Sequence, residues 1–420
     1  MSTQETSSQP AVPVRQPASG GGFSRRTLFA GAGAGLAVGA AGGMLAQGAT
    51  ATGGHRTPAL GAARVDFQGP HQAGIVQPQQ ARVQLAAFDL APNAGRAGLQ
   101  ALLKLWSQTA ARLAVGEPAP SHENQIALDA GPSSLTLTVG FGATLFDKAG
   151  LADRRPPQLN PLPDFPQDAI DRSRSDGDLW VQIGADDALV AFHALRVLQQ
   201  QAAGTAAVRW QMAGFARTPG ATAAPMTGRN LMGQVDGTNN PKPTDPDFAA
   251  KVFATGPDWM AGGSYLVLRR IRMLLDDWEN LPTDRQERFI GRRKSDGAPL
   301  SGGTETTAVD LTEQNPDGTL AIPADAHIRV AAPAANGGAA MLRRGFSYAD
   351  GVLPDGSPDA GLLFLAFQAD PARGFIPVQQ KLARGDGLTR FLRHEASGLY
   401  AVPRGVQGGE GYLGQALLEG

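Results

Sequence analysis

The order of strand-like and helix-like segments in residues 81–216 restricts the fold more than any other feature of the chain. Residues 82–90 alternate in the manner of a half-buried strand, and after Gly98 apolar residues recur with helical spacing. Further strands are predicted at residues 133–146, 178–185 and 206–216, with a helix at residues 187–201. A strand, a helix and a strand, followed by the same three elements again, is the plan of a ferredoxin-like domain.

A similar order of elements begins again after residue 231. Strands are predicted at residues 264–275, 361–369 and 397–405, with helical stretches that reach Ile290 and cover residues 371–383. No repeat is visible residue by residue, but the order indicates an α+β fold of two ferredoxin-like halves with antiparallel sheets and helices. The sequence therefore predicts an N-terminal domain in residues 52–230 and a C-terminal domain in residues 231–420, the second beginning with a linker.

The first 51 residues have the composition of an export leader. Residues 1–22 are rich in Ser, Gln, Pro and Gly, which predicts disorder. The paired arginines of SRRTLF (Ser24–Phe29) precede a mildly apolar Ala/Gly run and a small-residue site that ends at Ala51. This pattern predicts a twin-arginine signal, the twin-arginine translocon as partner, cleavage after Ala51 and a periplasmic or extracellular protein. A retained membrane anchor is the alternative, because the run is long enough to span a bilayer, although its glycines disfavour a stable helix.

The charge balance and the lack of cysteine exclude several classes of partner and cofactor. The chain has 37 basic and 38 acidic residues and a net charge of -1, so nothing favours nucleic acid or an anionic membrane as partner. With no cysteine, disulfides, thiolate-ligated haem and cysteine-held iron-sulfur clusters are excluded. The six histidines are scattered without the paired spacing of a zinc site. A small-molecule partner and a histidine as axial ligand of a haem remain compatible with this composition.

His327 is the candidate metal ligand. It lies in a stretch from Asp325 to Arg344 that is rich in Ala, Gly and Pro and ends in two arginines. Small residues would let a flat cofactor approach the backbone, and a single histidine can hold haem iron while the opposite face stays open. A hydrogen-bonded structural histidine is the alternative for a solitary His among short apolar residues.

A second stretch, GQVDGTNNP at residues 233–241, sets one carboxylate between small residues. Asp236 lies between Gly233 and Gly237, so a tight turn would let a ligand come close to its side chain. Such a carboxylate can act as a proton shuttle. An ordinary Asp-Gly turn is the alternative.

Together these two stretches resemble the dye-decolourising peroxidases, a family of haem enzymes. The family's Gly-x-x-Asp-Gly motif is matched by Gly233 to Gly237, its haem-ligating histidine by His327 in HIR, and its distal arginine by the pair in MLRRGFSY. The resemblance runs from HQAGI at His71 to YLGQALL near the end of the chain. It implies haem b bound in the second half, hydrogen peroxide as oxidant and a small aromatic or dye-like electron donor.

On the open face of the haem, the resemblance assigns catalysis to Asp236 and an arginine. Asp236 would act as general base and then acid, with Gly237 beside it to let the cofactor approach. Arg343 would stabilise the charge that develops as the O–O bond breaks, and Arg344 competes with it for this role. An aspartate with an ordinary pKa of about 3.9 remains a base in acid, so an acidic pH optimum is expected.

On the other face, the resemblance makes His327 the ligand of the iron, and its second ring nitrogen needs an acceptor that raises the basicity of the imidazole. Asp386, in RGDGLTRF, is the predicted acceptor, with a solvated loop carboxylate as the alternative. Arg329 is expected to pair with a haem propionate. Leu365 and Phe367 resemble the apolar wall that the family places over the distal haem face, although alternating strand residues are equally typical of a plain core.

Two other functions fit the same motifs. The resemblance extends to an exported subgroup for which release of iron from haem has been proposed, and such a deferrochelatase would yield free porphyrin instead of oxidised donor. A non-catalytic exported haem-binding protein would keep its haem and lose nothing measurable on Asp236→Asn. The sequence leaves open which electron donor is used and whether the chain forms a homo-oligomer.

Overall fold

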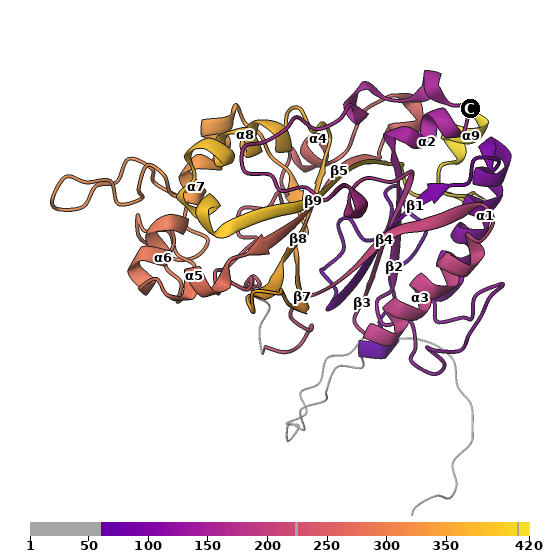
Figure 1. The fold of residues 1–420 in the computed structure, drawn as a ribbon, viewed down its shortest axis with the longest axis horizontal. Helices are drawn as coiled ribbons and strands as arrows, with labels where there is room; N and C mark the ends of the chain where they lie inside the picture. The colour runs from indigo at the N-terminus through magenta and orange to yellow at the C-terminus, as the bar shows by residue number, and fades with distance from the viewer. Residues whose placement is uncertain (1–59, 223–225, 410) are drawn as a thin grey trace, which may run out of the picture. The chain divides into compact units, whose positions relative to one another are not determined.

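The computed structural model describes residues 60–222, 226–409 and 411–420 (Figure 1). The predicted leader, with its twin-arginine signal and cleavage site, lies outside the described residues. Within the described ranges, no helix combines the length and the apolar character needed to cross a membrane.

Each half of the chain contains a four-stranded antiparallel sheet. The strands are β1 (Arg82–Leu90), β2 (Thr136–Gly142), β3 (Leu179–Ala185), β4 (Ala206–Phe215), β5 (Ser264–Met273), β6 (Leu342–Arg343), β7 (Phe346–Val352), β8 (Pro358–Gln368) and β9 (Leu392–Val402). The first half has the strand order β2-β3-β1-β4, and the second half has the order β9-β5-β8-β7, with the short β6 added at β8. The predicted α+β class with two ferredoxin-like halves is therefore confirmed.

Two edge-to-edge contacts join the halves. β4 pairs with β7 at Phe215 and Ser347, and β2 pairs with β9 at Phe141 and Ala401. Since β5 also pairs with β8, eight of the described strands close into a ring. A closed sheet has one face turned inward and one turned outward, so each strand carries two different sets of side chains.

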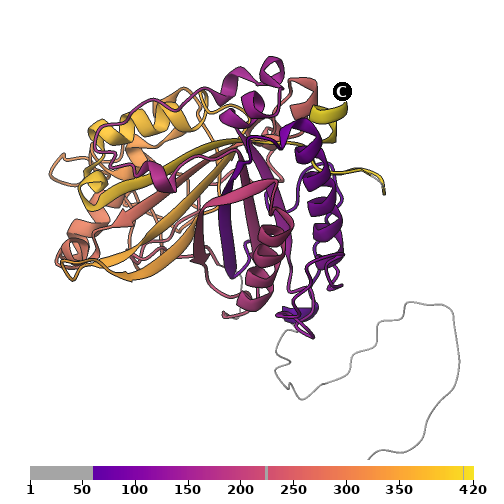
Figure 2. The same ribbon diagram turned by 45° about the vertical axis from the view of Figure 1, so that its right-hand side comes forward.

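Helices cover the outer face of the ring. They are α1 (Gly95–Leu113), α2 (Ala143–Lys148), α3 (Ala188–Gln201), α4 (Phe248–Val252), α5 (Leu275–Glu279), α6 (Thr283–Ile290), α7 (His327–Val330), α8 (Phe375–Gly385) and α9 (Gln415–Glu419). Two views show α1 and α3 over the strands of the first half and α8 over those of the second half (Figure 1, Figure 2). The described residues make up one unit by their contacts.

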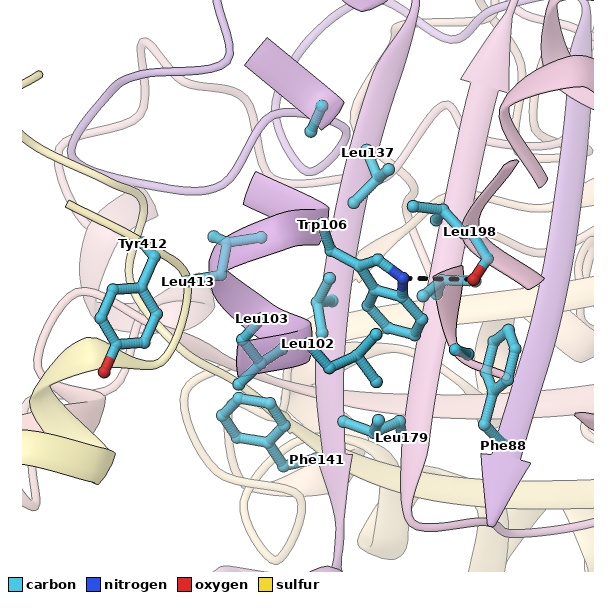
Figure 3. Close-up of a cluster of buried hydrophobic side chains, with 14 of the residues drawn as sticks. Phe88, Leu102, Leu103, Trp106, Leu137, Phe141, Leu179, Leu198, Tyr412 and Leu413 are labelled. Atoms are coloured by element: carbon cyan, nitrogen blue, oxygen red, sulfur yellow. Dashed lines mark hydrogen bonds between the residues drawn. The ribbon is translucent and has the colours of Figure 1, made fainter. Parts of the chain in front are cut away.

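The buried side chains form an inner and an outer layer. Inside the ring, apolar side chains from both halves pack together, among them Leu85, Trp180 and Leu365. Outside it, α1 packs on the first half through Trp106, whose indole Nε1 donates to the carbonyl of Leu198 in α3 at 3.2 Å (Figure 3). The helical spacing of apolar residues after Gly98 thus corresponds to the buried stripe of α1.

The predicted elements differ from the structure at several places, of which two have a clear physical reason. The strand expected at residues 133–146 ends at Gly142, where the backbone of Gly177 comes so close that a Cβ would lie 2.0 Å from its carbonyl oxygen, and α2 follows. β7 was not predicted, because only its first three residues are buried and the last four are exposed, which leaves no alternating pattern.

A histidine on β9 stays neutral because it is buried and because an arginine lies against it. Arg269, on β5, is 1% exposed and donates its Nε–H to Nδ1 of His394 at 3.3 Å. The same guanidinium donates to Ser397 Oγ at 3.1 Å and to the carboxylate of Asp168. Burial and the positive charge of Arg269 lower the pKa of His394 to about 3, so the ring carries no charge in the folded protein at neutral pH.

This histidine makes the folded state sensitive to acid. In the unfolded chain its pKa is about 6.5, so the unfolded state binds more protons below that pH, and stability is lost as the pH falls toward 3. The loss from this group is about 2 kcal/mol at pH 5. We expect His394→Gln, whose amide still accepts from Arg269, to lose less stability than the parent protein between pH 7 and pH 5 in urea unfolding.

The control is His122→Gln, because His122 is exposed and should contribute no such loss. Equal losses of stability in the parent protein and in both variants would contradict a neutral, buried His394.

Candidate functional site

The Gly-x-x-Asp-Gly turn lies in the linker between β4 and α4. Gly233 and Gly237 have φ angles of 78° and 128°, in the region that favours glycine. The N–H of Asp236 donates to the carbonyl of Gly228 at 2.9 Å, and Asn230 Nδ2 donates to Asp236 Oδ2 at 3.3 Å. The carboxylate is therefore held on a fixed turn while 31% of its side chain stays exposed.

Arg343 completes a charged pair with this carboxylate. It lies on β6 directly opposite Ala366 of β8, so the two side chains share one face of the sheet. Its Nη1 donates to Asp236 Oδ1 at 2.9 Å. Arg344, the next residue, points to the other face, where it is buried and donates to the carbonyl of Gln77 at 2.6 Å. Burial lowers the pKa of Arg344 to about 10. Of the two competing arginines, Arg343 is the one that lies beside Asp236.

His327 and Asp386 form a second pair. His327 begins α7, and its Nδ1–H donates to Asp386 Oδ2 at 2.7 Å. The other carboxylate oxygen accepts the N–H of Leu388 at 2.9 Å and so caps the short helix Gly387–Phe391. Because a carboxylate only accepts, the hydrogen of the neutral ring lies on Nδ1, and in that form Nε2 keeps its lone pair. The predicted contact between these two residues, which are 59 positions apart, is present.

Electrostatic effects link His327 to the charged pair. Burial lowers the pKa of His327, but the charge and the hydrogen bond of Asp386 raise it by more, so the pKa lies above its ordinary value. Arg343 and Asp236 also act on this pKa, in opposite directions. The Asp236–Arg343 pair therefore lies within electrostatic range of the His327 ring, whose side chain is 30% exposed.

The residues of the site fit a haem. Leu362 and Phe364 lie on the same face of β8 as Ala366, and therefore on the face that carries Arg343, and both are partly exposed and apolar. In the part of the chain that the structure describes, no three His, Cys, Asp or Glu side chains gather as a metal site. One free imidazole nitrogen beside an apolar wall suits an iron that arrives in its own macrocycle and takes a single protein ligand.

The predicted apolar wall was wrong in its register. Leu365 and Phe367 are fully buried inside the ring, on the face of β8 opposite to Arg343. Successive strand residues point to opposite faces, so the apolar side chains of β8 that share a face with Arg343 include those of Leu362 and Phe364.

Arg329 already has partners within the protein. Its guanidinium donates to the carbonyls of Leu311, Ile322 and Pro323, at 2.6 to 3.1 Å, and so ties α7 to the preceding loop. A bond from Arg329 to a haem propionate stays a prediction.

Three polar residues near the charged pair were not predicted as part of the site. Asn240 forms hydrogen bonds with the backbone of Arg343, and Thr238 Oγ1 donates to Glu305 at 2.9 Å. All three border a cavity of about 340 Å³ that reaches Arg343 and Gly237. Asn240 and Thr238 stand within the GQVDGTNNP motif, but the partner of a turn side chain cannot be read from its neighbours in sequence.

Comparison with known proteins identifies the class to which this fold and site belong. The family model described as Dyp-type peroxidase, N-terminal, matches residues 72–216, and that described as Dyp-type peroxidase, C-terminal, matches residues 227–407. The chain belongs to the Dyp-type peroxidase family and is a haem-dependent peroxidase, which confirms the family indicated by the motifs. The exact domain boundary at residues 230 and 231 stays a prediction.

Individual relatives extend this similarity over nearly the whole chain. The dye-decolorizing peroxidase of Thermobifida fusca is 43% identical over 423 residues, covering 95% of this chain and 98% of that protein. The deferrochelatase of Escherichia coli O157:H7 is 36% identical and covers 94% of this chain and 97% of that protein. A crystal structure of a DyP-type peroxidase from Streptomyces coelicolor is 62% identical, with a TM-score of 0.85, and covers 87% of this chain and 100% of that chain.

Replacing Asp386 should lower the pKa of His327. Asp386→Asn keeps an oxygen for the N–H of Leu388 but removes the negative charge that raises this pKa, so burial is opposed less strongly. We expect a lower pKa for His327 in the haem-free variant, measured by NMR titration of the imidazole Cε1–H signal. Asp325→Asn, at an exposed carboxylate close by, is the matched control. An unchanged His327 pKa in Asp386→Asn would show that the contact is not the cause of the shift.

Proposed function

We propose that this chain binds haem b through His327, reduces hydrogen peroxide and oxidises aromatic or dye-like donors. One observation carries the proposal: the Asp236–Arg343 pair, joined at 2.9 Å, lies close enough to the His327–Asp386 pair, joined at 2.7 Å, for its charges to act on the pKa of His327. The name of the Thermobifida fusca relative, a dye-decolorizing peroxidase, supports the class of donor.

The two pairs would divide the chemistry between them. Asp236 would take a proton from one oxygen of the peroxide and hand it to the other, which leaves as water. Arg343, which is always protonated, would hold the peroxide and stabilise the negative charge that develops on the leaving oxygen. Haem, when held at Nε2 of His327, supplies the electrons that reduce the peroxide and regains them from the donor. Asp386 would keep the imidazole oriented and more basic.

The cavity beside Arg343 would admit the peroxide. It is about 340 Å³ in volume and is bordered by Gly237, Asn240 and Arg343 on the side of the charged pair. Hydrogen peroxide is small and polar, so a cavity of this size with Asn240 and Arg343 in its lining is sufficient for it. The acidic pH optimum expected for an aspartate proton carrier stays a prediction.

Absorption spectra test the cofactor, its ligand and the reaction class together. We expect the purified protein, expressed with ample haem, to show a Soret band that shifts when one equivalent of hydrogen peroxide is added. His327→Ala should lose or strongly alter this band, because the ligand is gone. Asp236→Asn should keep the band, while the rate of its shift falls by about a hundredfold to ten-thousandfold, the range expected for loss of a proton carrier.

The controls are His122→Ala and Asp247→Asn, which change an exposed histidine and an exposed carboxylate. A colourless parent protein would remove the peroxidase proposal, and an undiminished rate in Asp236→Asn would remove Asp236 as proton carrier. Because some relatives are named deferrochelatase, iron release from haem is the second function to test. Recovery of free, intact porphyrin instead of oxidised donor would favour it.

We also propose that the protein is exported by the twin-arginine pathway to the periplasm or the exterior. The support is the SRRTLF sequence followed by an Ala/Gly run and a small-residue site ending at Ala51. Export of a folded protein would let the haem be inserted before the protein crosses the membrane.

Changing both arginines of the signal should block export. We expect Arg25→Lys with Arg26→Lys to leave the full-length chain in the cytoplasm, whereas the parent protein is recovered outside it with an N-terminus at Thr52, as measured by fractionation and intact mass. Arg15→Lys, upstream of the signal, is the matched control. Export of the doubly substituted protein at the parent level would contradict the proposal, and a full-length exported parent would favour the retained anchor.

A further inference from the structure

Among the residues that the structure describes, the strand that carries Arg343 has a neighbouring strand on one side and none on the other. In these residues the two-residue β6 pairs only with β8, where the N–H of Arg344 donates to the carbonyl of Leu365 at 2.7 Å. The alternation of an antiparallel ladder turns the N–H and C=O of Arg343 the other way, toward the free edge of β6. Unpaired peptide groups that are partly buried cost free energy, so this edge needs a partner.

The side chain of Asn240 is that partner. The N–H of Arg343 donates to Asn240 Oδ1 at 3.2 Å, and Asn240 Nδ2 donates to the carbonyl of Arg343 at 2.7 Å. A carboxamide carries one acceptor and a donor group in the same plane, as a peptide unit does. Asn240 therefore takes the place of one peptide unit of a missing neighbouring strand.

This contact joins the two parts of the structure that carry the charged pair. Asn240 follows Asp236 by four residues on the same turn, and the strand it holds carries Arg343. The side-chain hydrogen bonds of Asn230 and Thr238 do not reach β6. Asn230 bonds within the linker, and Thr238 bonds to Glu305. The Asp236–Arg343 contact itself joins two side chains that are 31% and 29% exposed, and ion pairs with this exposure contribute little stability on their own.

We propose that Asn240 is a positioning residue for peroxide reduction, because its amide sets the placement of the Arg343 guanidinium relative to the Asp236 carboxylate. The inference rests on the roles proposed above for Asp236 and Arg343. Proton transfer and charge stabilisation must act on the two oxygens of one peroxide, so the spacing of these two groups decides how well both act at once. A displacement of about 1 Å at a reacting centre can reduce a rate by about a hundredfold.

Steady-state kinetics of the haem-loaded protein test the inference. We expect Asn240→Ala to lower kcat/KM for hydrogen peroxide, per haem, by about tenfold to a hundredfold, while KM for the aromatic donor and the Soret band stay close to those of the parent. Asn240→Asp keeps the acceptor but not the donor and should also be impaired. Asn240→Gln keeps both groups on a longer stem and should recover part of the rate. Asn239→Ala, at the exposed adjacent asparagine, is the matched control and should behave as the parent.

A double substitution separates positioning from a merely structural role. If Asn240 acts through Arg343, then adding Asn240→Ala to Arg343→Leu should lower the peroxide rate by less than about threefold, because the group it positions is already gone. A full tenfold or greater further loss in that background would overturn the inference. So would a lower unfolding temperature in Asn240→Ala with an unchanged rate per haem.

The same series distinguishes this inference from the proposed function. If Arg343→Leu alone leaves the peroxide rate unchanged, the role proposed for Arg343 fails, and the inference fails with it. If Arg343→Leu is impaired but the Asn240 variants are not, only the inference fails. Should Asn240→Ala not retain haem, Asn240→Asp and Asn240→Gln are judged by the same criteria, and parent-level rates per haem in both would overturn the inference.

Discussion

Closure of the sheet is the constraint on which the rest of the structure depends. Two four-stranded sheets meet at both edges, through β4 with β7 and β2 with β9, and the shared interior is filled by apolar side chains from both halves. Because the interior is packed, a cofactor has to bind outside the ring. The chain between β5 and β7 crosses the outer face of the second half and carries α5, α6, α7 and β6, so it supplies both His327 and Arg343. The site therefore follows from the fold.

The sequence predicts most of the fold because apolar residues recur with a different spacing in its helices than in its strands. β1, α1 and α3 show their periods clearly, and their predicted positions agree with the structure to within a few residues. β8 shows where this reasoning fails. Both of its faces are covered, one by the ring interior and one by the site, so both alternating sets are apolar. The spacing of apolar residues then does not show which of Leu365 and Phe364 lies on the same face as Arg343. The choice needs the pairing of Arg343 with Ala366, which only the three-dimensional structure provides.

The lack of three-dimensional contacts in a sequence also explains why it singles out some residues of the site and not others. Asp236, His327 and one of two arginines stand out because small residues surround them or because a family motif marks them. Adjacent strand residues point to opposite faces, so sequence alone could not decide between Arg343 and Arg344. Asp386 is one of several loop carboxylates in the sequence, and its contact with His327 joins residues 59 positions apart, so no local pattern singles it out. Asn240 was not predicted as a site residue because it bonds to the backbone of Arg343. Backbone groups are the same in almost every residue, so such a contact leaves no signal in the sequence.

The two faces of the site are held in place by different means. Asp386 is fixed by a local bond, since the oxygen that does not meet His327 caps the short helix Gly387–Phe391. In the other pair, Asn230 supports Asp236 locally, but Asp236 and Arg343 come from segments 107 residues apart, and both are partly exposed. A group that orients one imidazole needs only to be rigid itself. Two groups that act on the same small molecule must be rigid relative to each other, and a bond across the two segments that carry them is the direct way to achieve this.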